Sequence, residues 1–400
     1  MLTIQSLTHL GLGRASDGQS LLPRVLPGEE VDVAQDGTLR IVTPSPDRVA
    51  APCRHYKSCG GCAMQHACNA FVADWKQDIV LKALQARGIS AEFRPIATSL
   101  PQTRRRAKFS GRRTKKGALV GFHAKASDTV IAVPDCQLLT PALTAALPAL
   151  EALTLLACSR KSEIGLTVTE TALGADVLVS TEKELTPQLR IELAALATQY
   201  SLSRLVWNDE PVVVINQPAQ EFGGTRVVPP PGAFLQATDH GQETLWRAVD
   251  EITAGARKVI DLFAGCGTFT LPLAKRAEVH AVEGDKALLD ALDHGWRSGH
   301  ELRKVTTEAR DLFRRPLEPD ELRPFDAAII DPPRAGAEAQ IAPLAASEIK
   351  TIAMVSCNPI TFARDARTLT TAGFHLGWVQ VVDQFRWSPH VEIVAPFTRK

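Results

Sequence analysis

The sequence lacks the segments that would place it in a membrane or send it out of the cell. No run reaches the roughly 18 consecutive apolar residues that a membrane helix needs. The first residues, MLTIQSLTHLGLGRASDG, do not join a basic region to an apolar one, as a secretory signal peptide does. We therefore expect a cytoplasmic protein with no membrane segment.

Internal repeats and low-complexity tracts are also absent, and the eight cysteines follow no secretory leader. In such a chain, cysteines point to metal binding or catalysis rather than to a disulfide framework. A length of 400 residues exceeds what one hydrophobic core usually organises. We therefore expect two or three domains.

The net charge of +1 favours no class of partner, but one stretch is basic and contains no acid. A local positive surface of this kind attracts phosphates, so the stretch predicts contact with a nucleic acid backbone. The alternative is a solvated pair of strands around a basic turn. The basic residues of the stretch are Arg104, Arg105, Arg106, Lys108, Arg112, Arg113, Lys115 and Lys116.

Three regions differ in their pattern. Residues 1–50 contain short apolar strands separated by turns such as LGLGRASDG and QDG, which is typical of a small β-barrel. Residues 51–230 begin with a cysteine-rich loop and a helix predicted over residues 69–85, and continue as an α+β middle domain. Residues 231–400 alternate strands and helices, which predicts an α/β fold with a parallel, doubly wound, Rossmann-like sheet and a terminal strand hairpin.

The strand VIDLF runs into AGCGTFT, where Gly265 and Gly267 allow a tight turn and a close approach of the backbone to a ligand. A helix is expected to begin at about Thr268 and to include TFTLPLAKRA. The third glycine that dinucleotide dehydrogenases normally have in this loop is missing. Glu283 ends the next strand, where a carboxylate can accept hydrogen bonds from both ribose hydroxyls.

Polar residues also end the strands that follow. Asp311 ends the third strand, where it could meet an adenine amino group, and Asp331 ends the fourth, inside DPPR. In an open parallel sheet, ligands bind outside the edge formed by the carboxyl ends of the strands. The alternative is that each acid merely caps the next helix, but that explanation fits one residue better than the whole set.

Cys357 lies where the apolar strand TIAMV meets Pro359, at the same edge. A helix starting near Ile360 is expected to lower the pKa of the thiol and favour the thiolate, and the alternative is a buried structural cysteine. Glu392 stands among apolar residues in HVEIV. Burial would raise its pKa and suit it to take a proton, whereas the alternative is a strand acid that faces solvent.

Cys53, Cys59 and Cys62 have the spacing C-x5-C-x2-C, with two glycines that let the loop fold tightly. The second C-x2-C of a zinc ribbon is missing, so the pattern favours a [4Fe-4S] cluster over zinc. Cys136 is the favoured fourth ligand, and Cys68 is its rival.

The motifs DLFAGCGTFTLPLA, DPPRAG, SCNPITFARD, HVEIV and CRHYKSCGGCAMQH together resemble the RNA uracil-C5 methyltransferases, which make 5-methyluridine in ribosomal and transfer RNA. The likeness covers nearly the whole chain, and residues 1–50 resemble a TRAM domain, an RNA-binding OB-like barrel. It implies a class I methyltransferase that uses S-adenosylmethionine and acts on RNA, as a monomer. A TRAM-like domain together with a cluster favours 23S rRNA over tRNA as the substrate.

The resemblance also assigns residues. It makes Cys357 the nucleophile that adds to C6 of uracil and Glu392 the base that removes the C5 proton. Thr238 and Thr268 stand where the family often has asparagine, which leaves open how these two positions bond. The implied cofactor contacts are Gln236, Phe263, Gly265, Thr268, Glu283, Asp311 and Asp331, and the implied cluster ligands are Cys53, Cys59, Cys62 and Cys136.

Two other functions remain to be separated from this one. A methyltransferase acting on an exocyclic amine would explain the proline-containing DPPR loop but needs no nucleophilic cysteine. An iron–sulfur RNA-binding or redox protein with a vestigial nucleotide site would explain the cysteines without any group transfer. Substitution of Cys357 separates the first alternative, and formation of a methylated product excludes the second.

Overall fold

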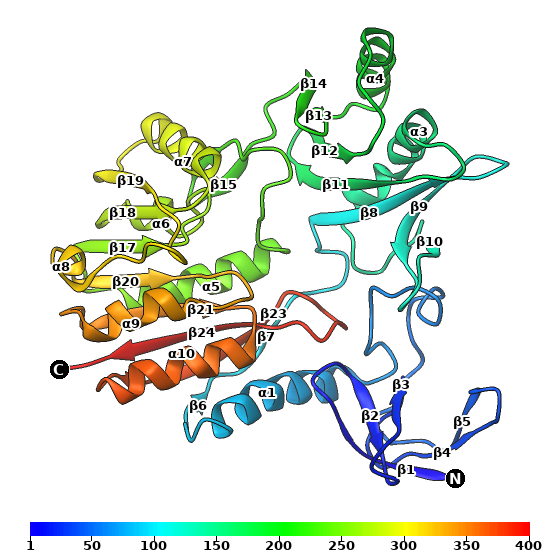
Figure 1. The fold of residues 1–400 in the computed structure, drawn as a ribbon, viewed down its shortest axis with the longest axis horizontal. Coiled ribbons are helices and arrows are strands. Elements are labelled where there is room, and N and C mark those ends of the chain that lie inside the picture. The colour runs from blue at the N-terminus through cyan, green and yellow to red at the C-terminus, as the bar shows by residue number, and fades with distance from the viewer.

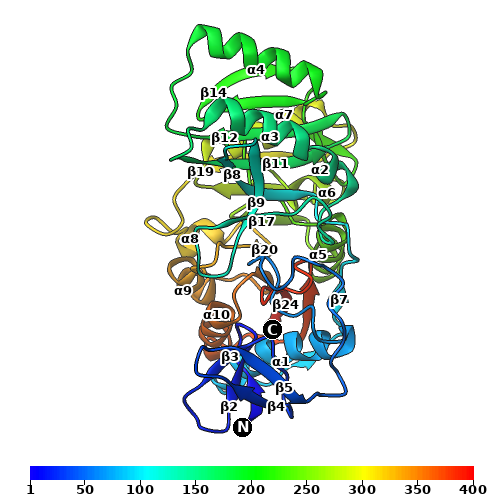
Figure 2. The ribbon, with the colours of Figure 1, turned by 90° about the vertical axis from the view of Figure 1, so that its right-hand side faces the viewer.

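The computed structural model describes residues 1–400, which form three sheets of five or more strands and one short hairpin. In Figure 1 the N-terminal sheet is blue, the middle sheet runs from cyan to green, and the C-terminal sheet fills the left half. The side view in Figure 2 puts the N-terminal sheet at one end and the middle sheet towards the other. No helix is both long enough and apolar enough to cross a membrane.

The N-terminal sheet is antiparallel, with the strand order β3-β2-β1-β4-β5. Ile4, Ala15, Val25 and Val31 form its core. The outer strands β3 and β5 pair with no further strand, so the hydrogen-bonded pairing does not close the barrel that the sequence predicts. The strands are β1 (Leu2–Leu7), β2 (Leu12–Ala15), β3 (Leu21–Pro23), β4 (Glu30–Val33) and β5 (Leu39–Thr43).

Strand β2 lies within LGLGRASDG, which was predicted as a turn. That prediction is wrong at Gly13, because this glycine permits close packing rather than chain reversal. A Cβ atom at Gly13 would lie 2.2 Å from Val25 and 2.9 Å from Ile4. Glycine inside a strand often marks such a close approach.

The middle sheet has the strand order β10-β9-β8-β11-β12-β13-β14. Leu150 and Leu153 of α3 pack with Phe109 of β8 and Leu166 of β11 in one core. This is the α+β arrangement that the sequence predicts. The elements are β8 (Arg106–Arg113), β9 (Ala118–His123), β10 (Val130–Ala132), α2 (Pro141–Ala145), α3 (Leu147–Ala157), β11 (Glu163–Thr171), β12 (Gly174–Ser180), α4 (Pro187–Gln199), β13 (Arg204–Trp207) and β14 (Glu210–Val214).

The C-terminal sheet has the order β19-β18-β17-β20-β21-β24-β23-β6, and its strands β17 to β21 pair in parallel. Its strands are β17 (Lys258–Leu262), β18 (Glu278–Glu283), β19 (Val305–Ala309), β20 (Ala327–Ile330), β21 (Thr351–Ser356), β22 (His375–Leu376), β23 (Trp378–Asp383) and β24 (Glu392–Thr398). The hairpin strands β15 (Gln220–Phe222) and β16 (Thr225–Val227) precede it.

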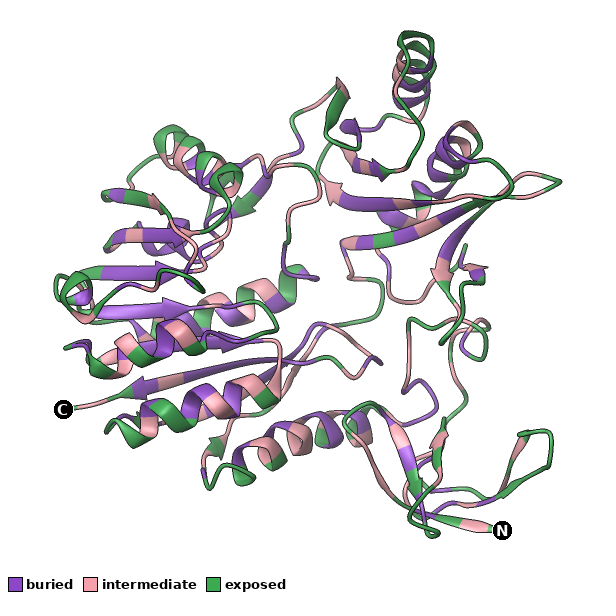
Figure 3. Cartoon of the chain, in the orientation of Figure 1, coloured by how far each residue is buried: buried purple, intermediate pink, exposed green.

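Helices cover both faces of this sheet. Ile341 of α9 and Phe362 of α10 pack on one face, and Leu245 of α5 packs on the other. Figure 3 shows the central strands buried between them. This is the doubly wound α/β class that the sequence predicts. The helices are α5 (Asp239–Ile252), α6 (Thr270–Leu273), α7 (Lys286–Ser298), α8 (Pro319–Leu322), α9 (Glu338–Ala346) and α10 (Pro359–Thr371).

The helix predicted over TFTLPLAKRA is shorter than expected. Its N-cap is Phe269 rather than Thr268, and α6 has only four residues. After α6 the chain forms a tighter, 3₁₀-like turn, in which the Lys275 N–H donates to the Pro272 carbonyl three residues back. Thr268 therefore belongs to the glycine turn and not to the helix.

Helix α1 (Asn69–Gln85) has the bounds that the sequence predicts, but it joins the C-terminal sheet. Val80 and Leu84 of α1 lie in the same core as Phe362. The strands that follow, β6 (Glu92–Phe93) and β7 (Ala97–Thr98), pair in parallel with β23 at the sheet edge. The predicted middle domain, residues 51–230, thus contributes residues 69–98 to the third region.

Candidate active site

Three polar side chains meet where strands of the C-terminal sheet end or begin. Asp331 follows β20 directly, and Cys357 follows β21. Strand β24 runs antiparallel to β21, with Ser356 opposite Ile393, so Glu392 begins β24 beside Cys357. The carboxyl ends of the parallel strands are the edge at which such sheets bind ligands. We call Asp331, Cys357 and Glu392 the strand-end site.

Asn358 links the two loops of this site. Its side chain accepts a hydrogen bond from the Ile360 N–H and so caps α10. The same side chain donates to the Arg334 carbonyl at 2.9 Å. The loop after Asp331 and the loop of Cys357 are therefore held together by one amide.

The pKa of Cys357 is shifted in the direction opposite to the one expected from the sequence. Burial, followed by the nearby Glu392 and Asp331 charges, raises the pKa of the thiol to about 12. The prediction that the start of α10 lowers this pKa is wrong, because desolvation and two like charges outweigh the helix dipole. Near neutral pH the thiol is protonated in this state of the protein.

Glu392 is buried, with 2% of its surface exposed, between the buried residues Val391 and Ile393. The solvent-facing alternative is therefore excluded. Burial, and then the Asp331 charge, raise the pKa of Glu392 well above its ordinary value. A buried carboxyl group of this kind binds a proton more readily than an exposed one, as a general base must.

Two aspartates, Asp331 and Asp261, also have raised pKa values. Burial raises the pKa of Asp331 to about 7, with the Asp261 charge as the second cause. Burial also raises the pKa of Asp261 to about 7. Asp261 accepts a hydrogen bond from the Thr270 hydroxyl at 2.6 Å, but its Oδ1 atom is buried without a partner. A buried oxygen without a donor is costly, and a ligand could supply one.

The glycine turn has the open backbone that a cofactor needs. Gly265 has a φ of +55°, its N–H donates to Glu283 Oε2 at 3.0 Å, and a Cβ atom there would meet nothing within 4 Å. Phe263 also adopts a positive φ, of 63°, and its ring lies 5.4 Å from that of the half-exposed Phe313. Asp311 follows β19 and accepts from the Phe313 N–H at 3.0 Å. These residues fit an adenosine-containing cofactor.

Gln236 is buried and bonds to Gln384, whose side chain is also hydrogen-bonded to Glu392 of the strand-end site. The Gln384 amide donates to Gln236 Oε1 and its oxygen accepts from the Ala237 N–H at 2.7 Å. Gln384 was missed at the sequence level, although it is a polar residue that follows an apolar strand, as Asp331 does. Thr238, one of the two threonines in place of asparagine, caps α5 through the Gly241 N–H.

The side chains of the basic stretch fall into a buried or half-buried group and an exposed group. Arg105 is buried, and its guanidinium donates to the Gln236 carbonyl at 3.1 Å and to Gln242 Oε1 at 2.7 Å. This arginine anchors the middle sheet to the start of α5, so the expected phosphate contact does not apply to it. The exposed basic side chains are those of Lys108, Arg112 and Arg113 on β8 and of Lys115 and Lys116 in the turn that follows it.

The four predicted cluster cysteines are half-buried. Burial, together with the nearby Cys136, Cys59 and Cys53 thiols, raises the pKa of Cys62 to about 12. Although these thiols influence one another, no group of three cysteine, histidine or acidic side chains is arranged to hold a metal ion. The structure therefore gives the cluster no support. Cys68, the rival ligand, donates to Asp47 Oδ1 at 3.4 Å.

Comparisons with known proteins agree with this geometry. The model of the tRNA (Uracil-5-)-methyltransferase family matches residues 231–400. An uncharacterized RNA methyltransferase of Brucella suis is 42% identical over 404 residues, covering 100% of this chain and 97% of its own. The 23S rRNA (uracil(1939)-C(5))-methyltransferase of Dichelobacter nodosus is 34% identical and covers 100% of this chain and 98% of its own.

Among solved structures, the Pyrococcus abyssi tRNA (uracil-54, C5)-methyltransferase in complex with S-adenosyl-L-homocysteine superposes with a TM-score of 0.77. It is 21% identical and covers 100% of this chain and 99% of its own. At this identity the likeness establishes the fold, which is that of a class I methyltransferase.

Proposed function

Since the chain belongs to the RNA (uracil-5-)-methyltransferase family, we propose that it methylates C5 of a uridine in RNA with S-adenosylmethionine as the methyl donor. The observation that best supports this is the meeting of Cys357, Asp331 and Glu392 at the edge that also holds the glycine turn. An amino-methyltransferase would need neither the thiol nor the buried base.

The chemistry explains why a thiol and a base are both needed. C5 of uracil is a weak nucleophile, and addition of the Cys357 thiolate to C6 moves electron density to C5, which can then attack a methyl group. S-adenosylmethionine supplies that methyl group on a sulfonium cation, whose positive charge favours nearby anions. With a pKa of about 12, the Cys357 thiol has to give its proton to water before it can attack. We therefore expect the thiolate to form when S-adenosylmethionine, with its positive charge, is bound.

Glu392 completes the reaction in this proposal. After methylation, C5 carries both the methyl group and its original proton. The Glu392 carboxylate takes this proton, and the electron pair of the C5–H bond forms the C5=C6 double bond. The pair of the C6–S bond leaves with Cys357, which regenerates the thiolate. Asp331 is proposed to hold the polar edge of the uracil beside the thiol, with the base turned out of any stack.

We further propose 23S rRNA as the substrate, with tRNA as the alternative. The relative from Dichelobacter nodosus that is named for 23S rRNA matches this chain over its full length. The division into a TRAM-like region (1–50), a middle domain (51–230) and a methyltransferase domain (231–400) is part of the same proposal. Mapping 5-methyluridine in RNA from cells that lack the gene would separate the two substrates.

A [4Fe-4S] cluster on Cys53, Cys59, Cys62 and Cys136 is also proposed, from the cysteine spacing alone. Such a cluster would order the loop of residues 53–62, here called the cysteine loop, and no catalytic step requires it. Iron and sulfide analysis of protein purified without oxygen tests this proposal. Absence of both would contradict it.

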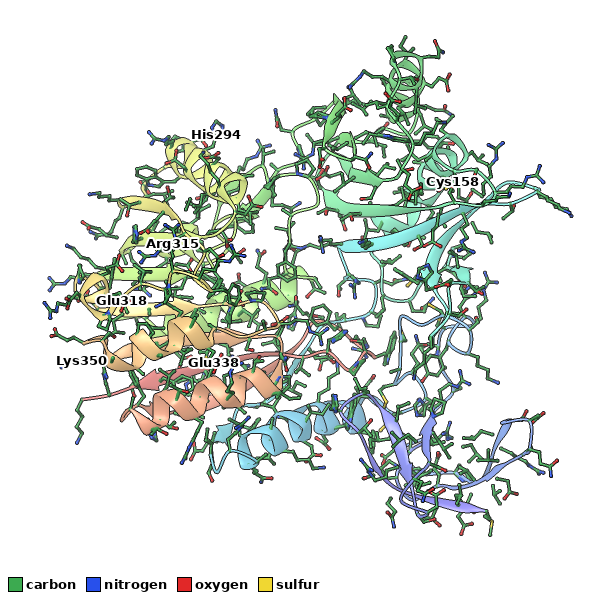
Figure 4. The ribbon with its side chains drawn as sticks, viewed as in Figure 1. Cys158, His294, Arg315, Glu318, Glu338 and Lys350 are labelled. Carbon is green, nitrogen blue, oxygen red and sulfur yellow. The ribbon has the colours of Figure 1, made fainter.

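The reaction itself is tested by transfer of labelled methyl groups to RNA, with 5-methyluridine as the measured product. Cys357→Ala is expected to abolish turnover, by about 10³-fold or more, because the nucleophile is lost. Cys158→Ala is the matched control, since Cys158 is a buried thiol of the middle domain (Figure 4). Unchanged turnover in Cys357→Ala would overturn the proposed mechanism.

A further inference from the structure

One lysine of α1 is entirely buried. Lys76 is 0% exposed, and its ammonium donates to Asp383 Oδ1 at 2.5 Å, to the Phe385 carbonyl at 3.1 Å and to the His390 carbonyl at 3.0 Å. An ammonium group has three protons to donate. All three are therefore used on a single segment of the chain, more than 300 residues away in sequence.

That segment consists of the end of β23 and the β23–β24 loop, residues 384–391. Asp383 is the last residue of β23, and Glu392 is the first of β24. Phe385 and His390 lie near the two ends of the loop, so Lys76 joins both of its arms from inside. Only Val391 separates His390 from Glu392 in the chain.

Other contacts hold the outer side of this loop. Gln384 bonds to Gln236 and Ala237, and the Trp387 carbonyl accepts from the N–H groups of Ala63 at 2.8 Å and of Met64. Trp387 itself has a φ of 60°, a backbone conformation that a bulky residue rarely adopts. These bonds fix single points of the loop. Inside the loop, the Ser388 N–H donates to the Phe385 carbonyl and the Ser388 hydroxyl accepts from the His390 N–H, and Lys76 adds a charged link between the same two arms.

Stability alone is a poor explanation for this arrangement. A buried ion pair loses the hydration of two charges, and well-packed apolar residues often replace such a pair without loss of stability. An ammonium does, however, fix three oxygen atoms at hydrogen-bond distance in defined directions, which apolar side chains cannot do. The pair is therefore better suited to setting a geometry than to adding stability.

We propose that Lys76 is a positioning residue for Glu392, which holds the β23–β24 loop so that this carboxylate reaches the C5 proton. The inference rests on the proposed function, in which Glu392 is the base. Glu392 acts after the methyl group has been transferred. Loosening the loop should therefore slow release of the methylated base more than it slows methyl transfer.

The experiment removes both charges together, because Lys76→Met alone would leave the Asp383 carboxylate buried without a partner. The double variant K76M/D383L is compared with R94M/E251L. Arg94 and Glu251 also form an ion pair between residues 69–98 and the C-terminal region, but this pair is exposed and does not touch the loop. All proteins are full-length, and their folding is checked by thermal unfolding.

Two rates are measured with an RNA fragment that contains the target uridine and with methyl-labelled cofactor: incorporation of label into RNA, and decay of the methylated protein–RNA adduct on denaturing gels. In K76M/D383L we expect adduct decay to slow by about 10- to 100-fold, the effect of a misplaced catalytic group. Methyl incorporation should change much less. R94M/E251L should match the wild type in both rates.

Two results would overturn the inference. Adduct decay at the wild-type rate in a folded K76M/D383L protein would show that the loop needs no such restraint. Unfolding of that variant would assign the pair a structural role only. Glu392→Gln separates this inference from the proposed function. If it traps the adduct while K76M/D383L does not, only the Lys76 inference fails, and if it traps none, the base assignment itself fails.

Discussion

The strand-end site and the cysteine loop both concentrate reactive side chains, but the fold builds them in different ways. Asp331, Cys357 and Glu392 are held by neighbouring strands of one sheet, whose register leaves little freedom. Cys53 to Cys62 and Cys136 lie in irregular segments outside named helices and strands. Regular pairing organises the first group without any ligand, whereas the second is not organised for a metal ion. Strand pairing alone can therefore assemble a candidate site, whereas a cysteine site for a metal would also need its ion.

The largest effect that would sharpen this comparison is expected at Glu392. Glu392→Gln should lower turnover by about 10²- to 10⁴-fold, because the C5 proton has no acceptor. One methyl group per enzyme should still transfer, and the protein should remain covalently bound to RNA on a denaturing gel. Glu338→Gln is the control, since Glu338 is an exposed carboxylate of the same region (Figure 4). A normal yield of free product would contradict the assignment.

The next effect concerns the cysteine loop. If a cluster is present, Cys62→Ser should remove its iron and lower the thermal midpoint, because metal binding then contributes to folding. Methyl transfer by the remaining folded protein should fall far less than in Glu392→Gln. If no cluster is present, the substitution should cost only the about 0.5–3 kcal/mol of an ordinary one. Iron analysis and thermal unfolding distinguish the two cases.

The buried aspartates predict a smaller effect, on stability against pH. Their pKa values are raised to about 7 in the folded protein, above the ordinary value, so the folded state binds more protons between about pH 4 and 7. Stability should therefore be greatest below this window and decline as pH rises through it. Each pH unit costs up to about 1.4 kcal/mol per proton released. Asp261→Asn should flatten the decline in urea denaturation, and an unchanged slope would contradict it.

The smallest effect is expected at the turn between β8 and β9 of the middle sheet. K115Q/K116Q should weaken RNA binding modestly and reduce the slope of log affinity against log salt by about 1–2, since up to two phosphate contacts are lost. Lys350→Gln is the control, because Lys350 is an exposed lysine of the C-terminal region (Figure 4). Equal slopes for both variants would show that this turn does not contact RNA.

Much of the C-terminal region could be predicted from the sequence, because its signals are local and repeated. Apolar strands of about five residues, each followed by a turn and a helix, predicted the doubly wound sheet and placed Asp331 and Cys357 at one edge. Glu392 joined them because a hairpin brings the start of its second strand back to the end of β21. Periodicity also gave helix α1 its correct bounds.

What could not be predicted depends on tertiary burial. The pKa of Cys357 was expected to fall because the helix start is visible in the sequence, whereas the desolvation and the two carboxylates that raise it are not. Arg105 and Lys115 belong to one charge run, yet one is buried and the other exposed. The partner of Lys76 was equally hidden, since nothing near residue 76 points to residue 383.

The joining of α1, β6 and β7 to the last strands of the chain has a consequence for protein synthesis. The 307 residues between Lys76 and Asp383 take on the order of tens of seconds to translate at roughly 5–20 residues per second. During that time the apolar face of α1, with Val80 and Leu84, has no sheet to cover it. The nascent chain therefore exposes apolar surface until its last strands are made, and a fragment of residues 231–400 would lack both the strands β6 and β7 and the lysine that joins the arms of its loop.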